Sequence, residues 1–256
     1  MKKLFIPILI LFISATAFAG FVQQKKRIIM SQSVAAPTSE CSGCLYQERS
    51  EGGATDVCTS TIDDNENTYA ACNDFNFDTS STLNGVTLEG SYAVLKTGNN
   101  DHAFGIDPAG TTANVQWFGL MVTVQTDNTS SDVPLVRIRD ATDNMLFHAG
   151  IAADGTFYVQ AEGGTQQKTV ATYSVNTKYY IKCSWTADAS DATISVKTDP
   201  DAAWPTTGDW YDTSTDGTDT SVADEWYQYI SNNEIVLIID DLRWSDTESD
   251  IDYSYQ

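Results

Sequence analysis

Two neighbouring stretches decide the fold: KYYIKCSWT (178–186) and ATISVKT (192–198). Both are rich in Tyr, Ile, Val and Thr, residue types that are common in β-strands. Side chains alternate between the two faces of a strand. In the first stretch, one face carries the apolar set Tyr179, Ile181, Cys183 and Trp185, and the other carries Tyr180, Lys182, Ser184 and Thr186. We therefore predict a strand with one buried face and one ordinary solvent face.

The same character continues along most of the chain after about residue 83. Short strand-like runs follow one another at a spacing of roughly ten residues, with almost no helical period. Ile235–Ile239 is continuously apolar and predicts a central strand that is buried on both faces. Asp154-Gly155 separates two such runs and indicates a hairpin. Many short, evenly spaced strands are typical of an all-β antiparallel β-sandwich or jelly roll.

The sequence divides into segments of different character. Residues 1–19 combine Lys2 and Lys3, an apolar core and a small-residue cleavage site, which predicts a signal peptide and an exported protein. We expect a linker at 20–40, a small Cys-rich segment at 41–77 and a sandwich at 78–246. The sandwich contains an insertion at 201–230, and an acidic tail follows at 247–256. An uncleaved membrane anchor is the alternative for residues 1–19, and no other apolar run is long enough to span a membrane.

Five cysteines suggest a second constraint on the fold. Exported proteins meet an oxidising compartment, so we predict two disulfides with open connectivity among Cys41, Cys44, Cys58 and Cys72. A zinc site made of the same four thiolates is the alternative. Cys183 lies on the apolar face of its strand and is predicted to be a buried free thiol.

The formal net charge of the chain is −21 at pH 7. Such a chain is repelled by nucleic acid and by anionic membranes, so neither is expected as a partner. The charge favours solubility and suits cations such as calcium. A glycan or a surface protein remains as the expected partner.

The stretch DWYDTSTDGTDTSVADEWYQYI (209–230) combines carboxylates with aromatic rings. Its DTSTDG run resembles the start of a calcium loop, in which alternate residues aim oxygen atoms inward. The candidate Ca²⁺ ligands are Asp212, Ser214, Asp216, Thr218 and Asp224, although the bidentate Glu expected at position twelve is replaced by Ala223. A solvated acidic turn is the alternative. Ser221 and Asp224 have capping-box spacing, which predicts a short helix after the loop.

Aromatic rings in and beside this stretch are candidates for stacking on a sugar ring. The candidate ligand-binding residues are Trp204, Trp210, Tyr211, Trp226 and Tyr227. Exposed Trp and Tyr rings present flat apolar faces, and nearby Asp side chains accept hydrogen bonds from hydroxyl groups. The alternative is that these rings anchor the insertion to the sandwich.

Several motifs, in this order, resemble laminin-G-like domains. They are GSYAVLKTGNNDHAF (90–104), ADGTFYVQA (153–161), TKYYIKCSWTADASDATISVKTD (177–199) and IIDDLRWSD (238–246). Asn176-Thr177 stands where that family usually has a Trp, and Thr198-Asp199-Pro200 replaces an Asp-Gly turn. The resemblance implies a concanavalin A-like jelly roll of two antiparallel sheets. It also implies carbohydrate or protein-ligand binding, in some members with calcium.

Catalytic patterns of related hydrolases and lyases are missing from the sequence. The paired carboxylates of a glucanase strand are absent, and His102 and His148 are the only histidines. Tyr180-Ile181-Lys182 matches a Tyr-x-Lys strand of alginate lyases, but neither histidine follows Gln-x. The sequence therefore favours a non-catalytic module that binds carbohydrate at a loop edge. An adhesive surface protein and a polysaccharide lyase or hydrolase are the two alternatives.

Overall fold

The structure is a computed structural model, and it describes residues 44–48, 112–126, 131–230 and 235–253 together with five short strands between residues 75 and 106. All of these strands lie in one unit, Ser39–Gln256. The predicted signal peptide (1–19) and linker (20–40) lie outside the described residues. None of the helices in the described part is long and apolar enough to cross a membrane.

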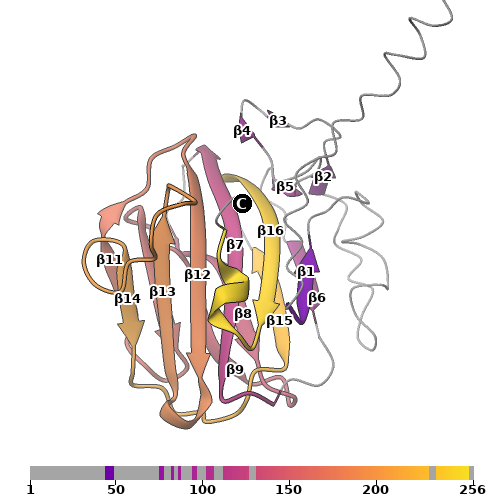
Figure 1. The fold of residues 1–256 in the computed structure, drawn as a ribbon, viewed down its shortest axis with the longest axis vertical. Coiled ribbons are helices and arrows are strands. Elements are labelled where there is room, and N and C mark those ends of the chain that lie inside the picture. Colours follow the sequence, from indigo (N-terminus) through magenta and orange to yellow (C-terminus); the bar gives the residue numbers. More distant parts are fainter. Residues whose placement is uncertain are drawn as a thin grey trace, which may run out of the picture. The chain divides into compact units, whose positions relative to one another are not determined.

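Two antiparallel sheets make up the fold (Figure 1). The eight-stranded sheet has the order β14 (Tyr211–Ser214), β13 (Asp191–Lys197), β12 (Lys178–Thr186), β7 (Val115–Thr126), β16 (Val236–Ser245), β5 (Val94–Lys96) and β2 (Phe75–Phe77), and β1 (Tyr46–Glu48) also pairs with β16. The six-stranded sheet has the order β11 (Gln167–Thr172), β10 (Thr156–Ala161), β9 (Met145–Ile151), β8 (Val133–Arg139), β15 (Glu225–Ile230) and β6 (His102–Ile106). A separate pair joins β3 (Thr82–Leu83) to β4 (Val86–Thr87). The predicted all-β architecture of two antiparallel sheets is confirmed.

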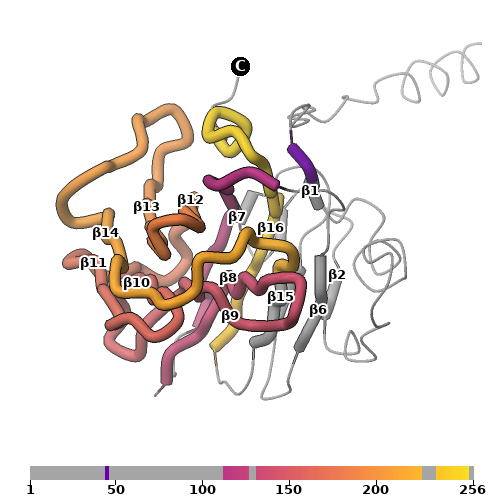
Figure 2. Tube along the Cα trace, turned by 90° about the horizontal axis from the view of Figure 1, so that it is seen from below, coloured from indigo at the N-terminus to yellow at the C-terminus, as the bar shows by residue number. Residues whose placement is uncertain are grey.

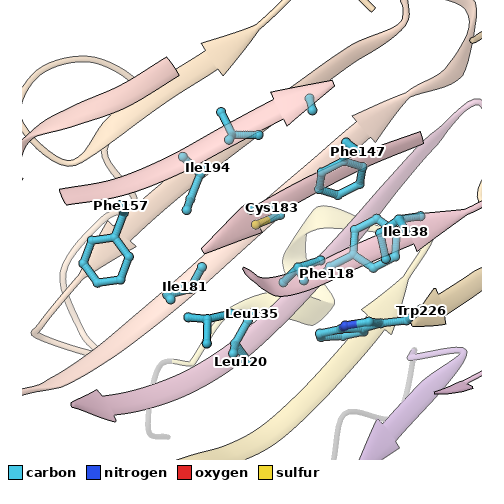
Figure 3. Close-up of a cluster of buried hydrophobic side chains, with 14 of the residues drawn as sticks. Phe118, Leu120, Leu135, Ile138, Phe147, Phe157, Ile181, Cys183, Ile194 and Trp226 are labelled. Carbon is cyan, nitrogen blue, oxygen red and sulfur yellow. The ribbon is translucent and has the colours of Figure 1, made fainter. Parts of the chain in front are cut away.

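The core lies between the two sheets and is rich in aromatic rings. The Phe118 ring centroid lies 5.0 Å from that of Trp244 and 5.9 Å from that of Trp226. The apolar face predicted for β12 is confirmed, because Tyr179, Ile181, Cys183 and Trp185 all belong to this core. Cys183 is fully buried, lies opposite Phe118 in the strand register and is a free cysteine, as predicted (Figure 3).

Two further strand predictions are confirmed. Strand β16 lies between β7 and β5, and the run Ile235–Ile239 within and before it is almost fully buried. The hairpin at Asp154-Gly155 joins β9 to β10, where Gly155 has a φ of 82° that a glycine adopts without strain.

The opposite face of β12 differs from the prediction of a solvent face. Tyr180, Lys182 and Ser184 are each only 4% exposed. The short 3₁₀ helix η3 (Glu248–Ile251) and the residues after it cover part of this face. The sequence alone does not predict that this distant segment packs on β12. Figure 2 shows the C-terminal segment and strands β8–β10 on opposite sides of β7 and β16. A second apolar cluster, Met121, Tyr180, Ile251 and Tyr253, therefore forms on the outer face of the eight-stranded sheet.

The segment predicted as an acidic insertion contributes strands to both sheets. β14 pairs with β13 in the eight-stranded sheet, and β15 pairs with β6 and β8 in the six-stranded one. The helix predicted after Ser221 is wrong, because Glu225–Ile230 is strand β15. Its backbone fills the position between β6 and β8, and pairing on both edges outweighs the local helical spacing. A 3₁₀ helix, η2 (Ala187–Ala189), makes the turn between β12 and β13.

Candidate ligand-binding groove

A groove lies on the outer face of the eight-stranded sheet. Its floor is formed by Lys182 of β12 and Lys197 of β13. Its walls are the loop after β13, which carries Trp204, and the C-terminal residues around Glu248 and Asp252. The groove has a volume of about 780 Å³. This volume falls within the range of roughly 300–1,000 Å³ that is typical of small-ligand pockets.

Both lysines point away from the core. In the register of β12 and β13, Lys197 lies opposite Tyr180, and Lys182 lies two residues further along β12. Tyr180 belongs to the outer cluster, whereas Ile181 and Val196 belong to the core between the sheets. Alternation along each strand therefore places the two lysines on the same outer face.

Trp204 lies over these two lysines. The Nζ of Lys182 is 4.9 Å from the centroid of the Trp204 ring, and that of Lys197 is 4.4 Å away. The indole N–H donates a hydrogen bond of 2.6 Å to the Oδ1 of Asp252. The ring is half-buried and lines the groove. Cation–π contacts from below and one hydrogen bond at the edge thus fix its orientation.

The loop that carries Trp204 begins with a turn set by its sequence. Asp199 precedes Pro200, and its Oδ1 accepts a hydrogen bond of 2.9 Å from the N–H of Asp201. Asp and Pro at these positions favour such a turn. Further along the loop, the carbonyl of Pro205 accepts a hydrogen bond of 3.0 Å from the hydroxyl of Ser195. The second hydrogen bond therefore ties the loop to β13 directly after Trp204.

Lys182 is a buried cation with an exposed partner. Its Nζ lies 2.5 Å from the Oε1 of Glu248, and the two side chains are 5% and 55% exposed. The Nζ also lies 5.2 Å from the centroid of the Trp117 ring. A buried charge needs a partner of opposite charge, and Glu248 supplies it. The ion pair thereby holds η3 against the sheet.

Lys197 is held by backbone oxygens. Its Nζ donates hydrogen bonds of 2.7 and 2.9 Å to the carbonyls of Pro200 and Ala202. Burial lowers the pKa of the Lys197 ammonium, and the nearby Asp252 carboxylate partly opposes that shift. The ammonium thus closes the turn that leads to Trp204.

The C-terminal wall is anchored to the sheet by buried polar contacts. Arg243 forms an ion pair of 2.6 Å with Asp241 and donates a hydrogen bond of 2.8 Å to the carbonyl of Asp252. The hydroxyl of Tyr253 donates a hydrogen bond of 2.9 Å to the carbonyl of Asp241. A Cβ at Gly119 would lie 2.6 Å from the Cγ2 of Ile251, so glycine makes room for this segment.

The predicted aromatic residues do not form one platform. Trp204 belongs to the outer face, whereas Trp226 is fully buried between the sheets and its ring is not accessible to a ligand. Trp210 packs against the same core, with its ring centroid 5.9 Å from that of Phe157 and 5.7 Å from that of Tyr179. Tyr211 is half-buried in β14, and burial raises the pKa of its hydroxyl. The side chain of Tyr227 lies outside the described residues.

Residues predicted to bind calcium lie in and after β14. Asp212 is half-buried and pairs with Ile194. The hydroxyl of Ser214 is buried, accepts a hydrogen bond from the N–H of Ala161 and donates one to the carbonyl of Thr165. Asp216 and Thr218 are exposed, and Asp224 is half-buried. In the described part of the chain, no three His, Cys, Asp or Glu side chains gather where they could hold a metal.

The N-terminal cysteines and His148 are the remaining residues considered in the sequence. Cys41, Cys58 and Cys72 lie outside the described residues, so the two disulfides expected among these three and Cys44 stay a prediction. His148 is half-buried on the six-stranded sheet, with its Nε2 3.1 Å from the Oε1 of Gln160. Burial lowers the pKa of the His148 ring.

Sequence reasoning missed four groove residues: Lys182, Lys197, Glu248 and Asp252. One signal was available, because Ile251 and Tyr253 are apolar residues at strand-like spacing within a segment interpreted as an acidic tail. They are the anchors that bring Glu248 and Asp252 to the sheet.

No protein family and no curated protein matches the sequence. Solved structures do match. The Botulinum neurotoxin serotype D binding domain has a TM-score of 0.51 at 9% identity, with 86% of this chain and 52% of that chain covered. The likeness concerns the fold alone and agrees with a β-rich sandwich.

Two other solved structures have lower scores. The T. cruzi calreticulin globular domain has a TM-score of 0.48 at 8% identity and covers 81% of this chain and 90% of that one. A Trypanosoma rangeli sialidase has a TM-score of 0.44 at 11% identity. That match covers 63% of this chain and 26% of the sialidase, so this chain spans only a minor part of the sialidase's length.

Proposed function

We propose that this protein is an exported, non-catalytic module that binds carbohydrate in the groove beside Trp204. One observation carries the proposal: a half-buried indole ring lines a hollow of about 780 Å³, together with carboxylates and hydroxyl groups. A sugar ring stacks its C–H groups on an aromatic face, while its hydroxyl groups donate hydrogen bonds to carboxylates. The groove offers both kinds of contact.

Fixed geometry supports the same proposal. Two lysines and Asp252 hold the Trp204 ring in place before any ligand arrives. Affinity rises when a binding surface is ordered in advance, because less conformational freedom is lost on binding. The proposed fold type is a concanavalin A-like jelly roll, supported by the two antiparallel sheets and by the motifs that resemble laminin-G-like domains. The proposed export rests on the N-terminal sequence.

A glycan array with the purified protein tests the proposal, followed by titration of Trp204→Ala with the best ligand. We expect the variant to lose about ten-fold in affinity, which corresponds to one lost stacking contact of about 1.4 kcal/mol. Thermal unfolding of the same variant shows whether it is folded.

Trp210→Ala is the matched control, because it removes the same side chain from the edge of the core. We expect it to lower the free energy of unfolding by about 2 kcal/mol, less than a fully buried Trp would cost because this ring is half-buried, and to leave the affinity of the folded protein unchanged. If Trp210→Ala instead loses affinity and Trp204→Ala does not, the ligand binds at the loop edge. If no glycan binds and a surface protein does, the adhesive alternative replaces this proposal; turnover of a glycan would replace it with the enzyme alternative.

A further inference from the structure

We propose that the groove selects neutral oligosaccharides and discriminates against acidic ones; this inference rests on the proposed function and names the class of its ligand. Two lysines in the floor of a groove would ordinarily suggest a site for a carboxylated or sulfated sugar. The contacts of each lysine indicate the opposite.

The charge of Lys182 is already compensated by the protein. Its side chain is 5% exposed and its Nζ is paired with Glu248 at 2.5 Å. An anionic ligand would have to displace that carboxylate, which belongs to the same chain and is held close by η3. The Lys182 ammonium thus supports Trp204 and presents little surface to a ligand.

The ammonium of Lys197 is likewise already bonded within the chain. The residue is buried, two of its three ammonium N–H groups donate to the carbonyls of Pro200 and Ala202, and the Trp204 ring lies 4.4 Å away. An ammonium in this position orders the loop, and it has little surface left for a ligand.

The charged groups that a ligand would meet are carboxylates. Asp201 and Asp252 line the groove and are exposed, whereas the charge of the third exposed carboxylate, Glu248, is compensated by Lys182. Carboxylate oxygens accept hydrogen bonds from the hydroxyl groups of a neutral sugar. They repel the carboxylate or sulfate of an acidic sugar, and the formal net charge of −21 adds a long-range repulsion.

Calorimetric titration with two sets of oligosaccharides of equal length tests the inference. One set is neutral and the other is built of uronic acids, and each is titrated at low and at physiological ionic strength. We expect the neutral set to bind tighter, with an affinity that salt does not change. Binding of the acidic set should improve as salt screens the repulsion. If the acidic set binds tighter and weakens with salt, or if both sets bind equally, the inference is wrong and the proposed function stands. If neither set binds in the titration or on the array, both are wrong.

Asp201→Asn removes one exposed carboxylate and keeps a side-chain acceptor. We expect its affinity for acidic oligosaccharides to rise about two- to five-fold, the size expected for one exposed charge pair, with no such rise for neutral oligosaccharides. Asp143→Asn is the matched control, because Asp143 is exposed in the turn between β8 and β9 of the other sheet. Its φ of 66° is one that Asn tolerates. If the control raises acidic binding as much as Asp201→Asn does, the discrimination comes from net charge and not from the groove.

Discussion

Lys182 and Lys197 show how a strongly acidic chain uses two of its few cations. Each ammonium lies over an aromatic ring, and each is tied to oxygen atoms of its own chain. Cation–π contacts grow stronger when the cation is shielded from water. The consequence is an indole ring held at a fixed angle over a sheet.

Cys183 is the second residue whose environment sets its chemistry. Burial raises the pKa of its thiol well above the ordinary value, so the thiol stays neutral in the folded protein. A group whose pKa is raised on folding contributes its full stabilisation below its unfolded pKa, about 8.5 for a thiol. That contribution is lost as the pH rises further, because unfolding then releases the proton.

We therefore predict that stability falls more steeply in the wild type than in Cys183→Ala between about pH 9 and pH 11. The difference should approach about 1.4 kcal/mol per pH unit. Chemical unfolding at several pH values measures it, and iodoacetamide should label Cys183 only after unfolding. Equal slopes in the two proteins, or labelling of the native thiol, would contradict the buried position.

At the scale of elements, β12 explains what a sequence predicts well and what it does not. Alternation assigned Tyr179, Ile181 and Cys183 to the core, because a period of two identifies the faces of a strand. It could not assign an environment to the opposite face. Lys182 is paired there with Glu248, which lies 66 positions away, and no local pattern records that contact.

Strand β15 is a second element whose structure the local sequence pattern does not decide. The sequence DEWYQYI (224–230) fits a helical stripe as well as a strand. Pairing with β8 and β6 decides between them, since a strand in that position satisfies backbone groups on both edges. The secondary structure of such a short segment of mixed pattern is therefore set by the strands that pair with it.

The contact between β7 and the C-terminal segment can be tested at Gly119. We predict that Gly119→Ala lowers the free energy of unfolding by about 1–3 kcal/mol, because the new Cβ would lie 2.6 Å from Ile251 Cγ2 and 2.7 Å from the Tyr253 hydroxyl oxygen. Guanidinium unfolding measures this effect. In a double-mutant cycle, Gly119→Ala should cost less when Ile251→Ala has already removed that methyl group. Additive effects of the two changes would mean that the segment does not pack on Gly119.

At the scale of the whole molecule, the net charge of −21 acts on every exposed site. Self-repulsion of like charges destabilises a folded chain, and dissolved ions screen it. Any cation will therefore raise the melting temperature to some extent. The predicted calcium site has to be separated from this general effect.

Calcium at the segment Asp212–Asp224 stays a proposal, and the structure suggests which ligands it would use. The hydroxyl of Ser214 already takes part in two hydrogen bonds within the chain, whereas Asp212 and Asp216 retain exposed surface. With few ligands, binding would be weak, in the range of about 10⁻⁴–10⁻³ M known for extracellular calcium modules. We predict that millimolar calcium raises the melting temperature more than magnesium does at equal ionic strength. The excess should vanish in Asp212→Ala/Asp216→Ala, because screening by ions does not depend on these two residues. If calcium and magnesium act equally on the wild type, the cation effect is screening alone and the acidic segment holds no specific site.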